Sequence, residues 1–149
     1  MRALIQRVKR AKVTVGGKQI AWIGEGMLLL LGIRRKDTPE DVGRLVDKVV
    51  NLRIFEDEAG KMNLSLKDTG GELLVVPQFT LYANTRKGRR PSFEDAMGAK
   101  DAQELFEEFI RELERRGFTP RRGRFGEHMV VSLDNDGPVT IIIDTEEKF

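Results

Sequence analysis

The sequence predicts a single α+β domain over residues 1–149, with a mixed or antiparallel sheet or open barrel and two packed helices. One observation favours the α+β class, and two more favour a single globular domain. The apolar patterns run in the order strands, helix, strands, helix, strands, which differs from the regular strand and helix alternation of a doubly wound fold. A chain of 149 residues fits one domain. Hydrophobic residues at 40% and charged residues at 34% are typical of a globular protein.

The first third of the chain is rich in strand patterns. Residues 2–15 alternate between apolar and polar side chains and are interpreted as one strand or a pair of strands. Gly16 and Gly17 predict a hairpin turn that leads into residues 18–23. The run from Met27 to Ile33 contains no polar side chain, which indicates a strand covered on both faces. We therefore expect this run to be the central strand.

Two segments show helical periodicity. Thr38 is a suitable N-cap and Pro39 suits the first helical position, after which apolar residues recur at three- and four-residue spacing over residues 42–50. A second amphipathic pattern covers residues 102–113, and Gly117 ends it. Each helix is predicted to pack one apolar face on the sheet.

Shorter elements follow the first helix. A turn over residues 56–60 leads to Met62, Leu64 and Leu66, whose alternation predicts a short strand. A further strand is expected over residues 72–76, where apolar residues run into Pro77.

Three other segments are interpreted as less regular. Residues 84–91 are basic and rich in turn formers, which predicts a mobile loop. Residues 118–125 are interpreted as a basic loop or an edge strand. The tail, residues 145–149, is expected to be frayed.

The composition excludes several kinds of site. The chain has no cysteine and one histidine, so disulfides and thiolate ligands are absent and a zinc site has almost no ligands. No GxxxxGK or GxGxxG phosphate loop is present. We therefore expect no metal and no cofactor. The longest apolar run, residues 27–31, is too short to span a bilayer, and no signal peptide pattern is present, so we expect a cytoplasmic protein without membrane contact.

The net charge of +2 is small, but the basic residues are unevenly distributed. Two groups of them could contact phosphates or could be solvated surface. One group is Arg86, Lys87, Arg89 and Arg90, and the other is Arg115, Arg116, Arg121, Arg122 and Arg124.

One stretch near the end of the chain joins a turn signal to a Gly-Pro peptide bond. Residues 135–140 contain Gly137 and Pro138 and lie between two β-like runs, 129–133 and 139–144. The pattern is that of a hairpin or edge turn, or of a cis bond whose surrounding carbonyl groups face a ligand.

A second stretch, residues 73–81, runs from apolar β-formers into Pro77, Gln78, Phe79 and Thr80. The residues after the proline are too irregular for every N–H group to be paired in a sheet. Unpaired N–H groups at a strand end can stabilise an oxyanion.

Together with residues 1–8, 90–93 and 123–125, these two stretches resemble the D-aminoacyl-tRNA deacylases, over residues 1 to about 143. The resemblance implies a β-barrel-like core with helices outside, assembled as a homodimer. It also implies hydrolysis of the ester that joins a D-amino acid, and mischarged glycine, to tRNA, while L-aminoacyl-tRNA is rejected. This activity would proofread chirality in translation. The partners implied are tRNA and a second copy, with no other protein.

The resemblance also implies roles for individual residues. Gln78 and the backbone groups of Phe79 and Thr80 would lie at the scissile ester. The bond between Gly137 and Pro138 would be cis, and its two carbonyl oxygens would enter the active site of the other subunit and exclude an L side chain.

Four further residues complete the implied site. Arg7 would hold the Gly-Pro segment, and Met129 and Phe125 would line its neighbourhood. Pro77 departs from the family, because most relatives carry Ser at this position. The departure removes a hydroxyl and an N–H at the mouth of the site and bears on how strictly the D form is selected.

The residues leave few options for catalysis. A Ser-His-Asp arrangement would need His128, which follows Gly126 and Glu127 and is expected at a loop edge. Thr80 could be a nucleophile, but no activating base is evident. We therefore expect water to attack the ester, assisted by backbone N–H groups near Phe79 and Thr80 and by the ribose 2′-hydroxyl.

Two other function classes remain open at this point. The chain could be a nucleic-acid-binding module whose cleft is inert, although one Trp and one Tyr offer few platforms for base stacking. It could also be a small-molecule binding protein with its pocket at a dimer interface.

Overall fold

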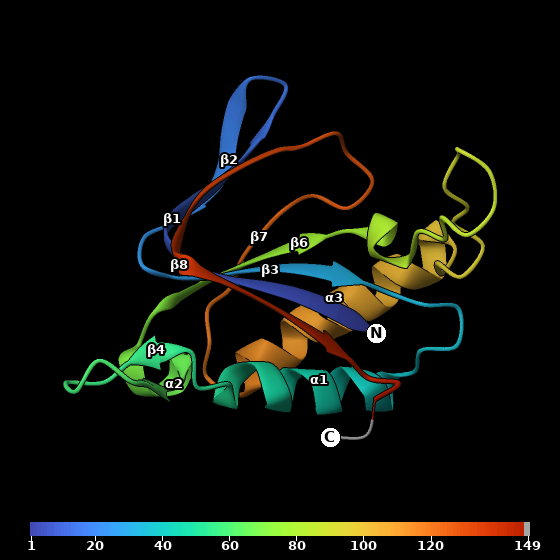
Figure 1. Cartoon of the computed structure of the whole chain (residues 1–149). Coiled ribbons are helices and arrows are strands. Elements are labelled where there is room, and N and C mark those ends of the chain that lie inside the picture. The colour runs from blue at the N-terminus through green and yellow to red at the C-terminus, as the bar shows by residue number, and fades with distance from the viewer. Residues whose placement is uncertain (148–149) are drawn as a thin grey trace.

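The computed structural model describes residues 1–147 and has the predicted α+β class (Figure 1). The strands are β1 (Arg2–Val15), β2 (Lys18–Ile23), β3 (Gly26–Gly32), β4 (Phe55–Glu56), β5 (Met62–Leu64), β6 (Glu72–Pro77), β7 (Arg121–Arg122) and β8 (Val130–Asp144). The helices are α1 (Pro39–Asn51), α2 (Leu66–Thr69), the 3-10 helix η1 (Phe79–Tyr82) and α3 (Ala99–Arg115).

One mixed sheet forms the core, in the order β2-β1-β3-β6-β7, and β8 pairs with β1 as well. Strand β1 is antiparallel to β2, β3 and β8, whereas β3, β6 and β7 are parallel to one another. The first half of β1 pairs with β3 and the second half with β2, while β8 follows it over almost its full length. The sheet therefore curls into a barrel-like core, with α1 and α3 packed outside it (Figure 1).

Strand β3 is the central strand that the unbroken apolar run predicts. Its side chains alternate between two hydrophobic clusters, because successive side chains of a strand point to opposite faces. Met27, Leu29 and Leu31 pack in the cluster that includes both long helices, and Leu28 packs in the second cluster, inside the curl of β1 and β2. Strand β6 divides its apolar residues in the same way. Both faces of the sheet are therefore dry at the strands that lead to the site.

The two long helices agree with their predicted signals. Helix α1 begins at Pro39 after Thr38, whose backbone N–H donates to the Asp41 carboxylate at 2.9 Å. Helix α3 contributes the fully buried Phe106 and Phe109, each worth roughly 1.5–3 kcal/mol of burial. Gly117, with φ of 88°, follows the end of α3 as predicted.

Two local predictions are wrong and one is resolved. Leu66 does not continue the strand of Met62 and Leu64 but begins helix α2, because Ser65 and Asp68 cap one another across its first turn. Thr145 is buried and its amide donates to the Met1 carbonyl at 2.9 Å, so the tail is anchored at its start. The last two residues of the predicted frayed tail, 148–149, lie outside the described residues. The basic segment 118–125 contains the edge strand β7.

The two β runs around Gly137 and Pro138 are one strand, β8, and not the arms of a hairpin. Gln6 pairs with Thr140 and Val8 with Asn135, so residues 136–139 bulge from β8 opposite a single residue of β1. The Asn135 amide closes the bulge, because it donates to the Val139 carbonyl at 3.2 Å and accepts from the Val139 N–H at 2.7 Å.

Candidate functional site

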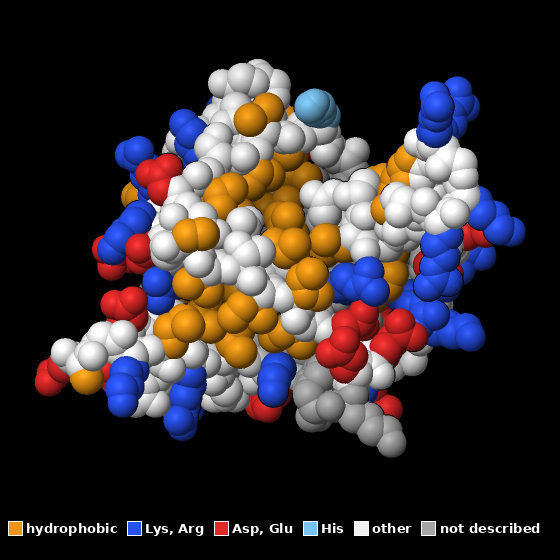
Figure 2. Space-filling view, in the orientation of Figure 1, with side chains coloured by type: hydrophobic (Ala, Val, Ile, Leu, Met, Phe, Trp, Pro, Cys, Tyr) orange, Lys and Arg blue, Asp and Glu red, His pale blue; other side chains and the backbone are white. Residues whose placement is uncertain are grey.

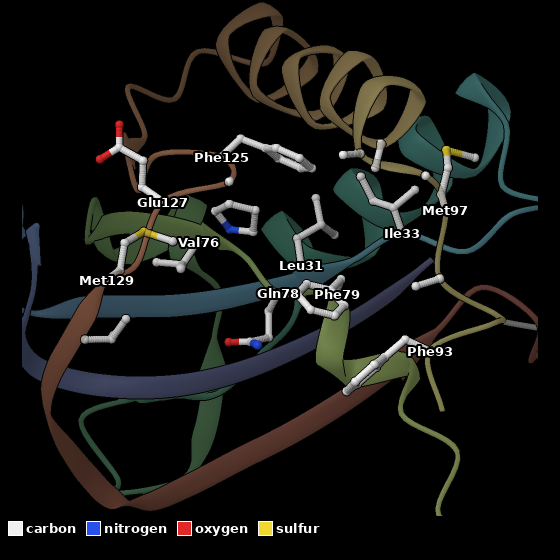
Figure 3. Close-up of a pocket in the computed structure, with 17 residues that line it drawn as sticks. Leu31, Ile33, Val76, Gln78, Phe79, Phe93, Met97, Phe125, Glu127 and Met129 are labelled. Carbon is white, nitrogen blue, oxygen red and sulfur yellow. The ribbon is translucent and has the colours of Figure 1, made fainter. Parts of the chain in front are cut away.

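An apolar pocket of about 620 Å³ opens at the carboxyl ends of β3 and β6. It is walled by the start of η1, the first turn of α3 and the segment between β7 and β8. Figure 2 shows hydrophobic side chains in the hollow, and Figure 3 shows the residues around it. The lining side chains used below belong to Pro77, Gln78, Phe79, Phe93, Phe125 and Met129.

The chain turns sharply where β6 meets the pocket. Pro77 is the last residue of β6 and lies opposite Leu31 of β3. The Gln78 amide then donates to the Leu31 carbonyl at 2.8 Å, which leaves that amide unavailable to a substrate. Helix η1 starts immediately afterwards, so the ladder between β3 and β6 fixes where the 3-10 turn lies.

The first two amides of η1 are the free donors of the site. The first hydrogen bond of this helix runs from the Leu81 N–H to the Gln78 carbonyl at 3.3 Å, so the amides of Phe79 and Thr80 precede it. Within residues 1–147 neither amide has a described acceptor. Two adjacent N–H groups at the edge of an apolar pocket can bind an oxygen that carries developing negative charge.

The Thr80 hydroxyl has an amide as its described partner. The Gln78 side-chain nitrogen donates to the Thr80 hydroxyl oxygen across two residues. A carboxamide cannot take up the proton of a hydroxyl, so this contact orients Thr80 without activating it as a nucleophile. The exposed Thr80 side chain therefore offers no better attacking group than water.

Aromatic and thioether side chains shape the rest of the pocket. Phe79 is 56% exposed and meets Phe93 edge to face, with ring centroids 5.0 Å apart. Phe125 packs against Phe106 of α3 at 6.1 Å. A Cβ on Gly123 would lie 2.8 Å from the Met129 sulfur, so the absence of a side chain at Gly123 lets Met129 reach the pocket.

The Gly137–Pro138 segment lies elsewhere on the chain. It is exposed at the tip of the bulge in β8, is absent from the pocket lining, and its peptide bond is cis. Arg7, almost fully buried, donates from Nε to the Asp136 carbonyl at 2.9 Å and from a terminal nitrogen to the Ile54 carbonyl at 2.7 Å. One guanidinium therefore ties the bulge of β8 to β1 and to the segment before β4.

The structure thus brings together five of the sequence-predicted residues, Pro77, Gln78, Phe79, Phe125 and Met129, with Thr80 adjacent to them. It forms a second group from Arg7, Gly137 and Pro138. Within one chain the two groups do not share the pocket.

A family model described as D-Tyr-tRNA(Tyr) deacylase matches residues 4–144. The chain belongs to this family. A D-aminoacyl-tRNA deacylase of Clostridioides difficile (strain 630) is 53% identical over 149 residues, which is 100% of both chains. A solved structure titled c-Myc DNA Unwinding Element Binding Protein is 44% identical, with a TM-score of 0.91 over 97% of this chain and 99% of that one.

A second solved structure, of a probable eukaryotic D-amino acid tRNA deacylase, has a TM-score of 0.80 at 19% identity and covers 95% of this chain and 97% of that one. At this identity the likeness concerns the fold. It agrees with the barrel-like α+β architecture of this member of the D-Tyr-tRNA(Tyr) deacylase family.

Several residues that line the pocket of this deacylase were not predicted from the sequence. Ile33 and Met97 reach the pocket from segments next to β3 and α3, and no local pattern distinguishes them from core residues. Phe93 belongs to the Arg-Pro-Ser-Phe motif, so its place in that motif was a usable signal. Glu127 lies on the pocket wall, and its carboxylate points away from the hollow in Figure 3.

Titratable side chains of the described residues form no metal cluster, since no three His, Asp or Glu side chains within residues 1–147 gather as ligands. In the same range no helix is long and apolar enough to cross a membrane.

Proposed function

We propose that this chain hydrolyses the ester bond of D-aminoacyl-tRNA and releases the D-amino acid and tRNA. The pair of unpartnered amides at Phe79 and Thr80, beside an apolar pocket in a chain of the deacylase family, carries this proposal. Water attacks the ester carbonyl, and the two N–H groups stabilise the oxyanion of the tetrahedral intermediate. Removal of one such donor typically costs about a hundredfold or more in turnover.

The chemistry of the substrate and the position of Gln78 support a mechanism that uses water and backbone N–H groups. An aminoacyl ester is an activated bond, so it needs positioning and charge stabilisation more than a strong base. Gln78, held by the Leu31 carbonyl through its backbone and by Thr80 through its side chain, is placed to orient the aminoacyl end. The ribose 2′-hydroxyl beside the ester supplies the polar group that positions the attacking water.

Chirality is selected by the Gly137–Pro138 segment of a second copy in a homodimer. This segment is exposed, held by the hydrogen bond from Arg7 to the Asp136 carbonyl, and absent from the pocket lining of its own chain, which suits a group that acts on a neighbouring copy. Its carbonyl oxygens occupy the side of the α-carbon where an L side chain would lie. Glycine carries no side chain there and is also accepted, so the activity would proofread both D-amino acids and mischarged glycine.

The decisive experiment compares D-aminoacyl-tRNA with L-aminoacyl-tRNA as substrates, each with and without EDTA. We expect release from the D ester and little release from the L ester, with no effect of the chelator. Equal hydrolysis of both esters would contradict the chirality mechanism, and hydrolysis of neither would contradict the enzyme assignment.

The Thr80→Ala variant separates the two catalytic schemes. We expect it to keep turnover within about tenfold of the parent chain, because the backbone N–H at position 80 remains and only a side-chain hydrogen bond, worth roughly 1 kcal/mol, is lost. Single-turnover hydrolysis of D-aminoacyl-tRNA is the measurement. Loss of all turnover in a folded Thr80→Ala protein would contradict the scheme in which backbone groups and water act without the hydroxyl.

A nucleic-acid-binding role without hydrolysis is the second candidate. The 44% identical structure is named c-Myc DNA Unwinding Element Binding Protein, which favours this candidate. The two schemes differ in one observable, because a pure binding module would retain aminoacyl-tRNA without releasing the amino acid.

A further inference from the structure

The two basic groups of the sequence differ in their pairing. In the group around the end of α3, Arg115 pairs with Glu108 and Glu112, and Arg116 pairs with Glu112 and Asp47. Hydrogen bonds from Arg115 and Arg111 lower the pKa of Glu108, so this carboxylate stays charged and neutralises its partners.

The arginines of this group that lie nearer to the pocket are also paired with carboxylates. Arg122 pairs with Glu107 and lowers the pKa of that carboxyl, and Arg124 lies 4.0 Å from Glu127. Of this group only Arg121 has no described carboxylate partner within residues 1–147. The cluster near α3 is therefore largely an internal network of ion pairs, with little charge left for phosphates.

The other group, here called the basic loop, covers residues 84–92 and is not neutralised. It contains Arg86, Lys87, Arg89 and Arg90 and no carboxylate. All four side chains are exposed, and the ion pairs described over residues 1–147 include none of them. The nearest acidic residues in sequence, Glu94 and Asp95, follow the loop and leave its net charge positive.

The basic loop is closed at its base by backbone hydrogen bonds and turns at a glycine at its tip. Asn84 and Ser92 exchange backbone hydrogen bonds of 2.8 and 2.9 Å, which close the loop into a hairpin-like projection. At the tip Gly88 has φ of 70°, a left-handed conformation that favours glycine. In Figure 2 basic side chains lie at the end of this projection, on one side of the apolar hollow.

The base of the loop is also part of the pocket. Phe93 directly follows the closing residue Ser92, lines the pocket and contacts Phe79, whose amide is one of the two free donors. A substrate whose reactive end enters the pocket would therefore carry the rest of its chain past the loop.

We propose that the basic loop binds the sugar-phosphate backbone of the tRNA acceptor end while the aminoacyl ester occupies the pocket. This inference rests on the proposed function for the identity of the substrate. Phosphates are the ligands expected of unpaired, exposed Arg and Lys side chains, and such contacts position a nucleic acid without reading its sequence. Contacts of this kind would serve tRNAs of different sequence equally.

The test uses two variants that remove the same number of charges. Arg89→Gln/Arg90→Gln alters the basic loop, and Arg111→Gln/Arg115→Gln alters exposed, ion-paired residues of α3. Binding of uncharged tRNA is measured by fluorescence anisotropy over a range of salt concentrations. Hydrolysis is measured on D-aminoacyl-tRNA and on a D-aminoacyl ester of adenosine, which has no phosphate backbone.

For the loop variant we expect tRNA affinity about tenfold weaker at 0.15 M salt and a salt slope reduced by about 1 for each lost cation. The KM for D-aminoacyl-tRNA should rise similarly, while hydrolysis of the adenosine ester should not change. The α3 variant should stay within about twofold of the parent chain in both assays.

Equal tRNA affinity and equal salt slope in the parent chain and the loop variant would overturn the proposal, as would an equal loss in the α3 variant. These binding outcomes do not depend on turnover. If the parent chain binds tRNA through the loop but hydrolyses neither ester, the proposed function fails and the binding surface stands.

Discussion

Replacement of Gly32 by alanine is expected to reduce hydrolysis of D-aminoacyl-tRNA on the order of a hundredfold while the chain stays folded. Gly32 is the last residue of β3, next to the carbonyl of Leu31 that holds Gln78. A Cβ at this position would lie 3.0 Å from the Leu81 Cβ and 3.2 Å from the Gln78 carbonyl oxygen. Both neighbours belong to the turn that presents the free amides, so this turn has to shift.

The expected loss of activity comes from displaced hydrogen-bond donors and not from the removal of a reacting group. Donors to an oxyanion work at 2.7–3.1 Å from the developing charge, so a displacement of η1 by a fraction of an ångström weakens both hydrogen bonds. The overpacking itself should cost about 1–3 kcal/mol of stability. Measurement of kcat and of the melting temperature together separates the two effects.

Gly43→Ala is the matched control for this variant. Gly43 lies within α1, and a Cβ there would meet nothing within 4 Å. Alanine should stabilise the helix by roughly 0.5–1 kcal/mol and leave hydrolysis unchanged. Turnover of Gly32→Ala within twofold of the parent chain would show that the position of η1 does not govern catalysis.

The central strand could be predicted because a strand that is buried on both faces has apolar side chains at consecutive positions. Met27 to Leu31 are all apolar, and the structure assigns alternate members to two separate clusters. The error at Leu66 arose from a competition between two local signals. The apolar alternation of Met62, Leu64 and Leu66 favours a strand, but reciprocal capping between Ser65 and Asp68 stabilises a helix from Leu66 onward.

The pocket and the bulge depend on pairings between segments that are far apart in the sequence. The pattern of a single segment therefore does not predict them. The bulge at residues 136–139 exists because β8 carries extra residues relative to β1, and only the register of both strands shows this. The basic groups look alike in the sequence and differ through contacts such as that between Arg116 and Asp47, which are 69 residues apart. The resemblance to the deacylases supplied Gln78 and Arg7 where local patterns had no signal for them.

Replacement of Arg7 by alanine is expected to lower the preference for D- over L-aminoacyl-tRNA by about tenfold to a hundredfold. The Arg7 side chain is 8% exposed and donates to the carbonyls of Asp136 and Ile54. A hydrogen bond from a charged donor contributes about 1.5–3 kcal/mol, and 1.4 kcal/mol corresponds to a factor of ten. Without this tether the Gly137–Pro138 segment can yield to an L side chain, so the preference should fall mainly because L-aminoacyl-tRNA is hydrolysed faster.

Arg10→Ala tests whether the position of the arginine matters. Arg10 lies on the same strand, is 79% exposed and pairs with Asp134 on the surface, so its loss removes the same charge without loosening the bulge. Arg7→Lys keeps the charge at position 7 but lacks the forked geometry that reaches two carbonyls at once, and it should lose part of the preference while folding more readily than Arg7→Ala. An unchanged D to L ratio in folded Arg7→Lys and Arg7→Ala proteins would contradict a tether role. The bulge would then have to owe its rigidity to Asn135, whose amide spans it from Val139.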